Sequence, residues 1–220
     1  MTSNRTILES DEQALKTELD AMYGRVSLAL DKAIQSLRDC NVDIASQVIA
    51  EDSIINSLQH KIEEIGIQTI ARQQPVASDL RKLMTDIFVS MELERIADHA
   101  VAIARIVLKL ELVPAEQYLQ PISAMAEKCK AMLKEVMQAY DETDDQLARN
   151  VAAMDDEIDR AEEEIINLMM RKIAGEPTLY NVSTYLLWIT HNLERIGDRI
   201  TNIAERVIYM ATSETPELNR

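Results

Sequence analysis

Hydrophobic positions along the chain follow a helical period in six long segments. Apolar side chains in the fifth segment alternate steps of three and four residues, as Val151, Met154 and Ile158 illustrate. Such steps place apolar side chains on one face of a helix. Prolines and short polar stretches separate the segments. We therefore expect helices at about 7–38, 43–72, 77–111, 115–140, 144–174 and 178–211.

An internal repeat relates the two halves of the chain. Residues 93–98 read Leu-Glu-Arg-Ile-Ala-Asp, and residues 193–198 read Leu-Glu-Arg-Ile-Gly-Asp. The helix before each motif also matches its counterpart, with Val48 aligned to Val151. Long helices with apolar stripes bury them when they pack side by side in antiparallel order. The pattern predicts an all-α fold of two tandem, pseudo-symmetric three-helix bundles, in residues 1–112 and 113–220, with six long antiparallel helices.

The amino-acid composition favours helices, and the net charge limits the kinds of molecule that the protein is expected to bind. The 220 residues include only 4 Gly and 5 Pro, and 4% are aromatic, which disfavours a protein built from strands and turns. A net charge of −15 repels nucleic acid and anionic lipids, so we expect no nucleic-acid partner. No apolar run reaches the ~18 residues that span a bilayer. We expect a soluble, cytoplasmic protein.

Oxygen-bearing side chains form rows on two helices of the second half. On segment 178–211 they are spaced by four, four and three residues, and on segment 144–174 by four and three, so each row lies on one helix face. Carboxylates placed so closely repel one another, and a cation reverses the sign of that interaction. Two rows on neighbouring helices can converge on one metal ion. The candidate ligands are Asp155, Asp159, Glu162, Glu194, Asp198, Asn202 and Glu205.

The first half repeats these acids only in part. Asp52, Glu94 and Asp98 match acids of the second half and are its candidate metal ligands. Ala102 and Arg105, however, stand where the second half has oxygen-bearing side chains. We therefore expect the stronger metal site in the C-terminal half.

The histidine positions and the lack of familiar catalytic motifs argue against an enzyme. His60, His99 and His191 have no counterparts in the repeat, and we expect surface or packing positions for them. The Glu-x-x-His pattern of di-iron bundle proteins, the Gly-rich phosphate loop and the zinc-protease motif are missing from the sequence. Two alternatives remain open: a carboxylate-bridged, metal-dependent enzyme on a helical bundle, and a metal-free helical scaffold.

The duplicated motif, the helical periodicity and the acidic composition together resemble the PhoU family over essentially the whole chain. The family hallmark is a Glu/Asp-x-x-x-Asp motif in each half, matched here by Glu94 with Asp98 and by Glu194 with Asp198. The resemblance implies two similar three-helix bundles. It also implies that divalent or trivalent metal, iron or zinc, binds at the acidic motifs and that the protein has no catalytic turnover.

The same resemblance implies a regulatory role. PhoU-like proteins restrain phosphate-specific transport and keep the phosphate-starvation two-component response off when phosphate is plentiful. The partners implied are the ATPase subunit of the phosphate transporter, a sensor histidine kinase and a second copy of the chain in a homodimer. The chain would then reach the membrane only indirectly, through these partners.

Overall fold

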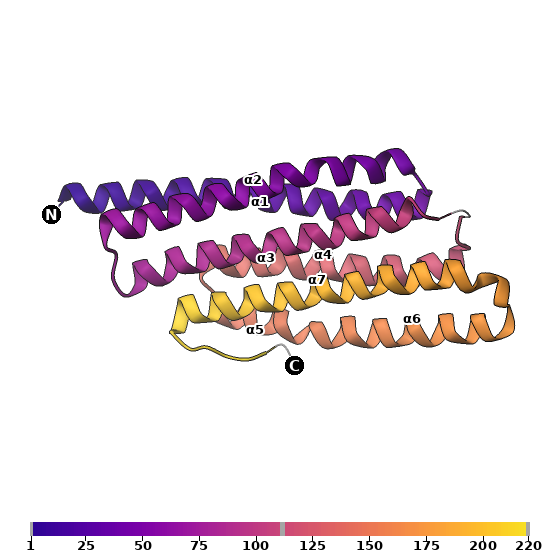
Figure 1. Cartoon of the computed structure of the whole chain (residues 1–220). Helices are drawn as coiled ribbons and strands as arrows, with labels where there is room; N and C mark the ends of the chain where they lie inside the picture. Colours follow the sequence, from indigo (N-terminus) through magenta and orange to yellow (C-terminus); the bar gives the residue numbers. More distant parts are fainter. Residues whose placement is uncertain (1, 111–112, 219–220) are drawn as a thin grey trace.

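The computed structural model describes residues 2–110 and 113–218, and within them it contains helices and connecting turns but no strand (Figure 1). The first bundle comprises α1 (Thr2–Asp39), α2 (Val42–Gln73) and α3 (Ser78–Val107). The second comprises α4 (Glu116–Glu142), α5 (Asp145–Ala153), α6 (Asp155–Gly175), the 3₁₀ turn η1 (Pro177–Leu179) and α7 (Tyr180–Thr212). This confirms the all-α prediction of two three-helix bundles.

Two predicted boundaries fall at residues 111–112, which lie outside the described residues. The predicted third helix would end at residue 111, whereas α3 ends at Val107. The division between residues 112 and 113 stays a prediction. In the described part of the chain, no helix is long and apolar enough to cross a membrane.

The turn between the first two helices is built in the same way in both bundles. Cys40 and Thr143 both adopt left-handed backbone conformations, with φ of 46° and 54°. Asn41 and Asp144 follow them, and their side chains accept hydrogen bonds from backbone N–H groups in the first turn of the next helix. Such N-caps satisfy donors that have no partner within the helix. The repeat is therefore visible in local hydrogen bonding as well as in overall topology.

The two motif helices, α3 and α7, pack against each other in antiparallel order at the centre of the molecule (Figure 1). At one level, His99 Nδ1 lies 3.0 Å from Asn192 Oδ1, and at another the Asn202 amide donates to Glu92 Oε2 at 3.3 Å. The apolar residues of both motifs are fully buried in the shared core: Leu93, Ile96, Leu193 and Ile196. The apolar half of each motif therefore contributes to one continuous hydrophobic core.

The predicted helix 144–174 is wrong at one point, because the chain breaks there into α5 and α6. The Met154 N–H donates to the Val151 carbonyl at 3.0 Å, and the Glu157 N–H donates to the Met154 carbonyl at 2.9 Å. Both bonds span three residues, so the turn is tightened as in a 3₁₀ helix. Three consecutive acidic residues follow, beginning at Asp155, and negative charge favours a helix N-terminus.

Candidate metal centre

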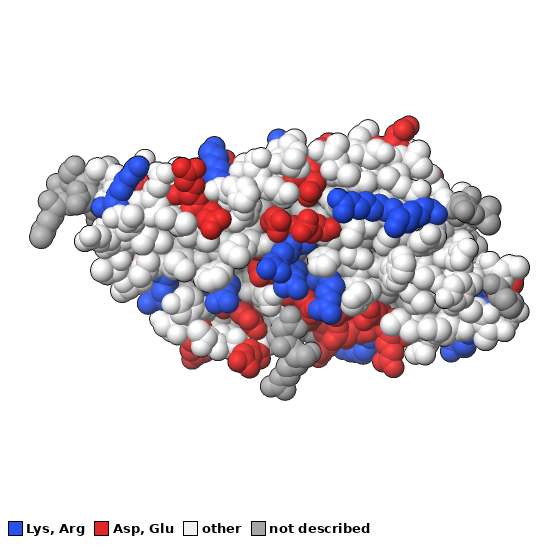
Figure 2. All heavy atoms as spheres, viewed as in Figure 1, with Lys and Arg blue, Asp and Glu red and all other residues white. Residues whose placement is uncertain are grey.

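Acidic side chains of α6 face the acidic motif of α7 and form two adjoining groups. We name the first the aspartate cluster, made of Asp155, Asp159 and Asp198. We name the second the histidine cluster, made of Glu162, His191 and Glu194. Figure 2 shows acidic side chains gathered over α6, next to basic side chains along α7. The antiparallel course of the two helices brings the predicted acids of α6 and α7 together.

Burial and mutual repulsion disfavour the charged form of carboxylates in the aspartate cluster. Burial, followed by the charges of Asp159 and Asp198, raises the pKa of Asp155 to about 6. Burial and the charge of Asp198 likewise raise the pKa of Asp159. Oδ1 of Asp155 is buried and accepts no hydrogen bond from the described residues. Arg195 neutralises part of this charge, since its guanidinium donates to Asp198 Oδ2 at 3.0 Å.

The histidine cluster joins the two helices through one imidazole nitrogen. His191 Nδ1 lies 3.3 Å from Glu162 Oε1 and 3.4 Å from Glu194 Oε2. One possible ligand atom from each of the three residues lies within 4.8 Å of the others. Burial, then the charges of Asp198 and Glu162, raises the pKa of Glu194. The three side chains are therefore close enough to hold a single cation.

The expectation that His191 is only a surface or packing residue missed these two carboxylate contacts. Its side chain is 55% exposed, but Nδ1 faces carboxylates on both helices. Met91 occupies the corresponding position of the first half, so the repeat gives no signal for His191. The available signal was the spacing of His191 and Glu194, which at three residues apart lie on one helix face.

The structure places two predicted ligands with other partners. The amide of Asn202 donates to Glu92 Oε2 on α3, and Oε1 of Glu205 accepts the Leu218 N–H at 2.6 Å. These bonds tie α7 to the first bundle and to the C-terminal segment. Neither bond supports a place in a metal site on α6, so the ligand role of both residues stays an untested prediction.

The first half carries a weaker version of the same arrangement on α2 and α3. Burial and the charge of Asp98 raise the pKa of Asp52, and burial followed by the same charge raises that of Glu94. Oδ1 of Asp52 is buried and accepts no hydrogen bond from the described residues. Asn56 stands where the second half has an aspartate, and its amide lies 3.4 Å from Asp52 Oδ2. Fewer carboxylates converge here than between α6 and α7.

The donor sets of both halves fit a cation, and that of the second half fits better. Buried carboxylate oxygens without donors are unfavourable, and a positive ion supplies the missing partner. Carboxylates suit hard ions, and an added imidazole suits borderline ions such as zinc and iron. The second half offers five carboxylates and one imidazole: Asp155, Asp159, Glu162, Glu194, Asp198 and His191.

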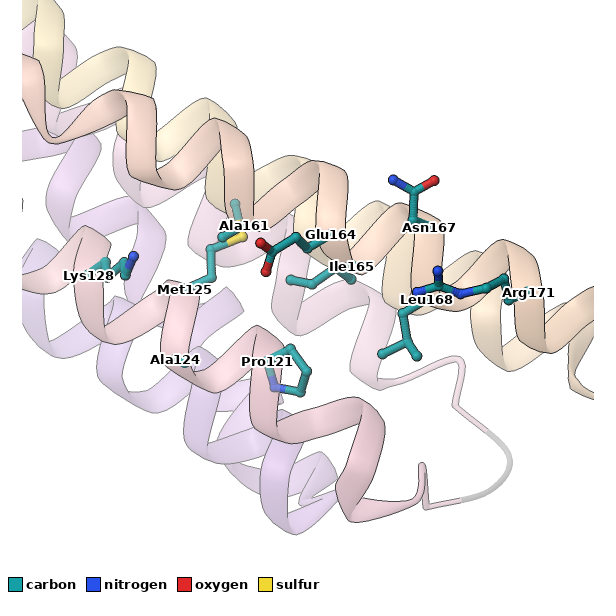
Figure 3. A pocket seen from close by; sticks show the side chains of 10 residues that line it. All are labelled: Pro121, Ala124, Met125, Lys128, Ala161, Glu164, Ile165, Asn167, Leu168 and Arg171. Carbon is teal, nitrogen blue, oxygen red and sulfur yellow. The ribbon is translucent and has the colours of Figure 1, made fainter.

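A cavity of about 600 Å³ lies elsewhere on the second bundle, between α4 and α6 (Figure 3). Met125 of α4 and Ile165 and Leu168 of α6 point into it. Lys128 and Glu164 add opposite charges to the lining. Among its lining residues only one is acidic and none is a histidine, so this hollow lacks the ligand chemistry of the α6–α7 clusters.

Comparison with known proteins relates the whole chain to one family. The PhoU domain pattern matches residues 19–107 and 122–207. The phosphate-specific transport system accessory protein PhoU homolog of Clostridium acetobutylicum is 34% identical, over 98% of this chain and 99% of that protein. PhoU homolog 1 of Thermotoga maritima is 31% identical, over 94% of this chain and 89% of that protein.

Solved structures agree with these sequence matches. The crystal structure of PhoU from Pseudomonas aeruginosa superposes with a TM-score of 0.90 at 29% identity, covering 94% of this chain and 99% of that one. The phosphate transport system regulatory protein PhoU from Streptococcus pneumoniae gives 0.89 at 27% identity, covering 96% and 99%.

Proposed function

The chain belongs to the PhoU family, and from that membership we propose that it is an accessory protein of a phosphate-specific transport system. One observation supports the proposal most directly: a relative that bears this description aligns with 98% of this chain, and the alignment covers 99% of the relative. Fold alone would not carry it, because one fold hosts many functions. The alignment covers nearly the whole of both proteins at 34% identity, so the proposal rests on family membership as well as on the fold.

In finer detail, we propose a cytoplasmic adaptor without catalytic turnover. It restrains phosphate uptake and keeps the phosphate-starvation two-component response off when phosphate is plentiful. Its proposed partners are the transporter's ATPase subunit, a sensor histidine kinase and a second copy of the chain. Long helices support this role because they present wide, rigid surfaces on which partner helices can dock.

We further propose that iron or zinc binds between α6 and α7 and that partner binding depends on this metal. A cation shared by Asp155, Glu194 and their neighbours offsets the repulsion that raises their pKa values. The ion then holds the two helices together and stiffens one face of the second bundle. Affinity for the ATPase subunit, measured before and after chelation, tests this dependence, and equal affinities would contradict it.

A phosphate-regulon reporter in a strain lacking its own PhoU protein tests the regulatory role. In phosphate-rich medium, the wild-type chain is expected to switch the reporter off, and the Glu194→Ala/Asp198→Ala variant is expected to leave it on. Glu163→Ala/Glu176→Ala is the matched control, because it removes the same charge at two exposed positions. A reporter that stays on with the wild-type chain would contradict the proposal.

A further inference from the structure

We infer that the groove between α4 and α6 docks an amphipathic helix of a partner protein, one that has an apolar stripe and carries acidic, basic and acidic side chains in that order. The inference deepens the proposed adaptor role and rests on it for the existence of a protein partner. It names a docking surface, the α4–α6 groove, and the chemistry of the helix that fits it. The surface lies apart from the repeated acids of α7.

The α4–α6 groove has an apolar floor (Figure 3). Met125 of α4 and Ile165 of α6 form this floor and are 1% and 2% exposed. The cavity of about 600 Å³ adjoins a second hollow of about 180 Å³. The two share three lining residues: Lys128, Ala161 and Glu164. Together they form one groove that follows α6 over several turns.

The first bundle has the same floor but covers it. Met22 and Ile62 are the counterparts of the two floor residues in the repeat, and both are fully buried. Leu58 of α2 corresponds to Ala161 of α6 and packs against the hydrophobic core. Because alanine is much smaller than leucine, Ala161 leaves space above the floor of the second bundle.

An ion pair that ties the first two helices together is also missing from the second bundle. Lys61 Nζ of α2 lies 2.7 Å from Glu18 Oε1 of α1. Their counterparts are Glu164 of α6 and Pro121 of α4, and both line the groove. A carboxylate and a proline ring cannot form such a bridge. The groove is therefore open because of specific substitutions at its rim.

Charges along the rim of the groove alternate in sign. Arg160, Glu164 and Arg171 are exposed side chains of α6 that line it. They are four and seven residues apart, so they share one helix face and lie about 6 Å and about 10 Å from one another along the helix axis. Lys128 of α4 is already bonded to Glu157 at 2.7 Å. A complementary surface therefore places negative charge opposite both arginines and positive charge opposite Glu164.

A helix is the occupant that best meets these requirements. The groove runs between two antiparallel helices, so a helix lying in it becomes the fourth member of a bundle. Residues four and seven positions apart share one face of any α-helix, so a docked helix can present all three complementary charges at once. Anionic lipid and nucleic acid are disfavoured by the net charge of −15.

Fluorescence anisotropy of the full chain with two labelled synthetic helical peptides tests the inference. The first peptide has leucines along one face and Glu, Lys and Glu at the spacing of the three rim charges. The second has the same leucines but Lys, Glu and Lys. We expect the first to bind at least roughly ten-fold more tightly and to lose this advantage at high salt. The net charge of −15 alone would favour the second, so equal affinities or the reverse order would overturn the inference.

Filling the groove locates the binding. Ala161→Leu copies the first bundle, and we expect it to weaken binding of the first peptide by at least roughly ten-fold, because the leucine occupies the space that the peptide needs. The unfolding midpoint should stay at or above the wild-type value, which separates this loss from misfolding. Ala211→Leu is the control, because it makes the same change at an exposed position of α7. Unchanged affinity in Ala161→Leu would overturn the inference.

Removing one rim charge gives a second test that changes no buried volume. Arg171→Gln copies Gln68 of the first bundle, and we expect roughly three-fold weaker binding of the first peptide. Arg72→Gln, at an exposed arginine of α2, is the control. Equal losses in both variants, or a wild-type chain that binds neither peptide, would also overturn the inference. The phosphate reporter tests the accessory role separately.

Discussion

Oδ1 of Asp155 lies directly beside the backbone of Gly197, so that a Cβ atom added to this glycine would be only 2.6 Å away. Such a distance is shorter than van der Waals contact permits. The second copy of the motif has glycine at this contact, and the first copy carries Ala97 at the corresponding position. The missing side chain lets Asp155, the first residue of α6, approach the motif of α7.

Replacing Gly197 with alanine should displace Asp155 more than it destabilises the fold. Overpacking costs about 1–3 kcal/mol, and alanine regains about 1 kcal/mol of helix propensity over glycine. We expect a free energy of unfolding within about 2 kcal/mol of the wild type, together with reduced metal affinity. Gly24→Ala is the control, because a Cβ there meets nothing within 4 Å. Unchanged metal affinity in Gly197→Ala would show that the position of Asp155 is unimportant.

Neutralising Asp155 should have opposite effects with and without metal. Its folded-state pKa of about 6 exceeds the usual 3.8, so the folded protein binds this proton more tightly than the unfolded chain does. Its contribution to stability therefore falls as the pH rises from about 4 to about 6. In chelator at pH 7, Asp155→Asn should raise the melting temperature. With metal present, Asp155→Asn should lower the melting temperature relative to the wild type, because a ligand is lost. A rise under both conditions would argue against ligation.

A buried pair that joins the two bundles gives a separate pH prediction. Tyr140 of α4 donates a hydrogen bond of 2.5 Å to Asp86 of α3, and burial raises the pKa of Asp86 to about 6. A rise from 3.8 corresponds to roughly 3 kcal/mol of stability lost between about pH 4 and pH 6. Asp86→Asn should remove that loss. Denaturant unfolding of the wild type and of Asp86→Asn at pH 4.5 and pH 7 measures this loss. The same change in stability between the two pH values in both proteins would contradict the raised pKa of Asp86.

The helices and their arrangement in two bundles could be predicted from the sequence. The spacing of apolar residues shows which helix faces are buried, and the internal repeat shows that the two halves pack in the same way. The break at Met154 could not, since that residue continues the apolar pattern and only its backbone hydrogen bonds change partner. The same limit applies to the site. The repeat predicted Glu194 and Asp198 as site residues, but it gave no signal for His191. The contacts of His191 depend on which face of α6 is turned toward α7.

Building the missing ligands into the first half should create a second histidine cluster. Gln59→Glu/Met91→His reproduces the second half at both positions, next to the existing Glu94. We expect one additional Zn²⁺ per chain, with a Co²⁺ spectrum like that of the natural site. Gln59→Glu alone, which adds the charge without the nitrogen, is the control. Equal zinc stoichiometry in the double variant and the wild type would show that these residues are insufficient.

Elemental analysis of protein purified without chelator or metal-affinity resin tests the central claim, a metal bound between α6 and α7, most directly. It compares the wild type with Glu194→Ala/Asp198→Ala and with the corresponding Glu94→Ala/Asp98→Ala. We predict stoichiometric iron or zinc in the wild type, lost in the first variant and largely retained in the second. A wild type without metal, or a first variant that keeps all of it, would contradict the account.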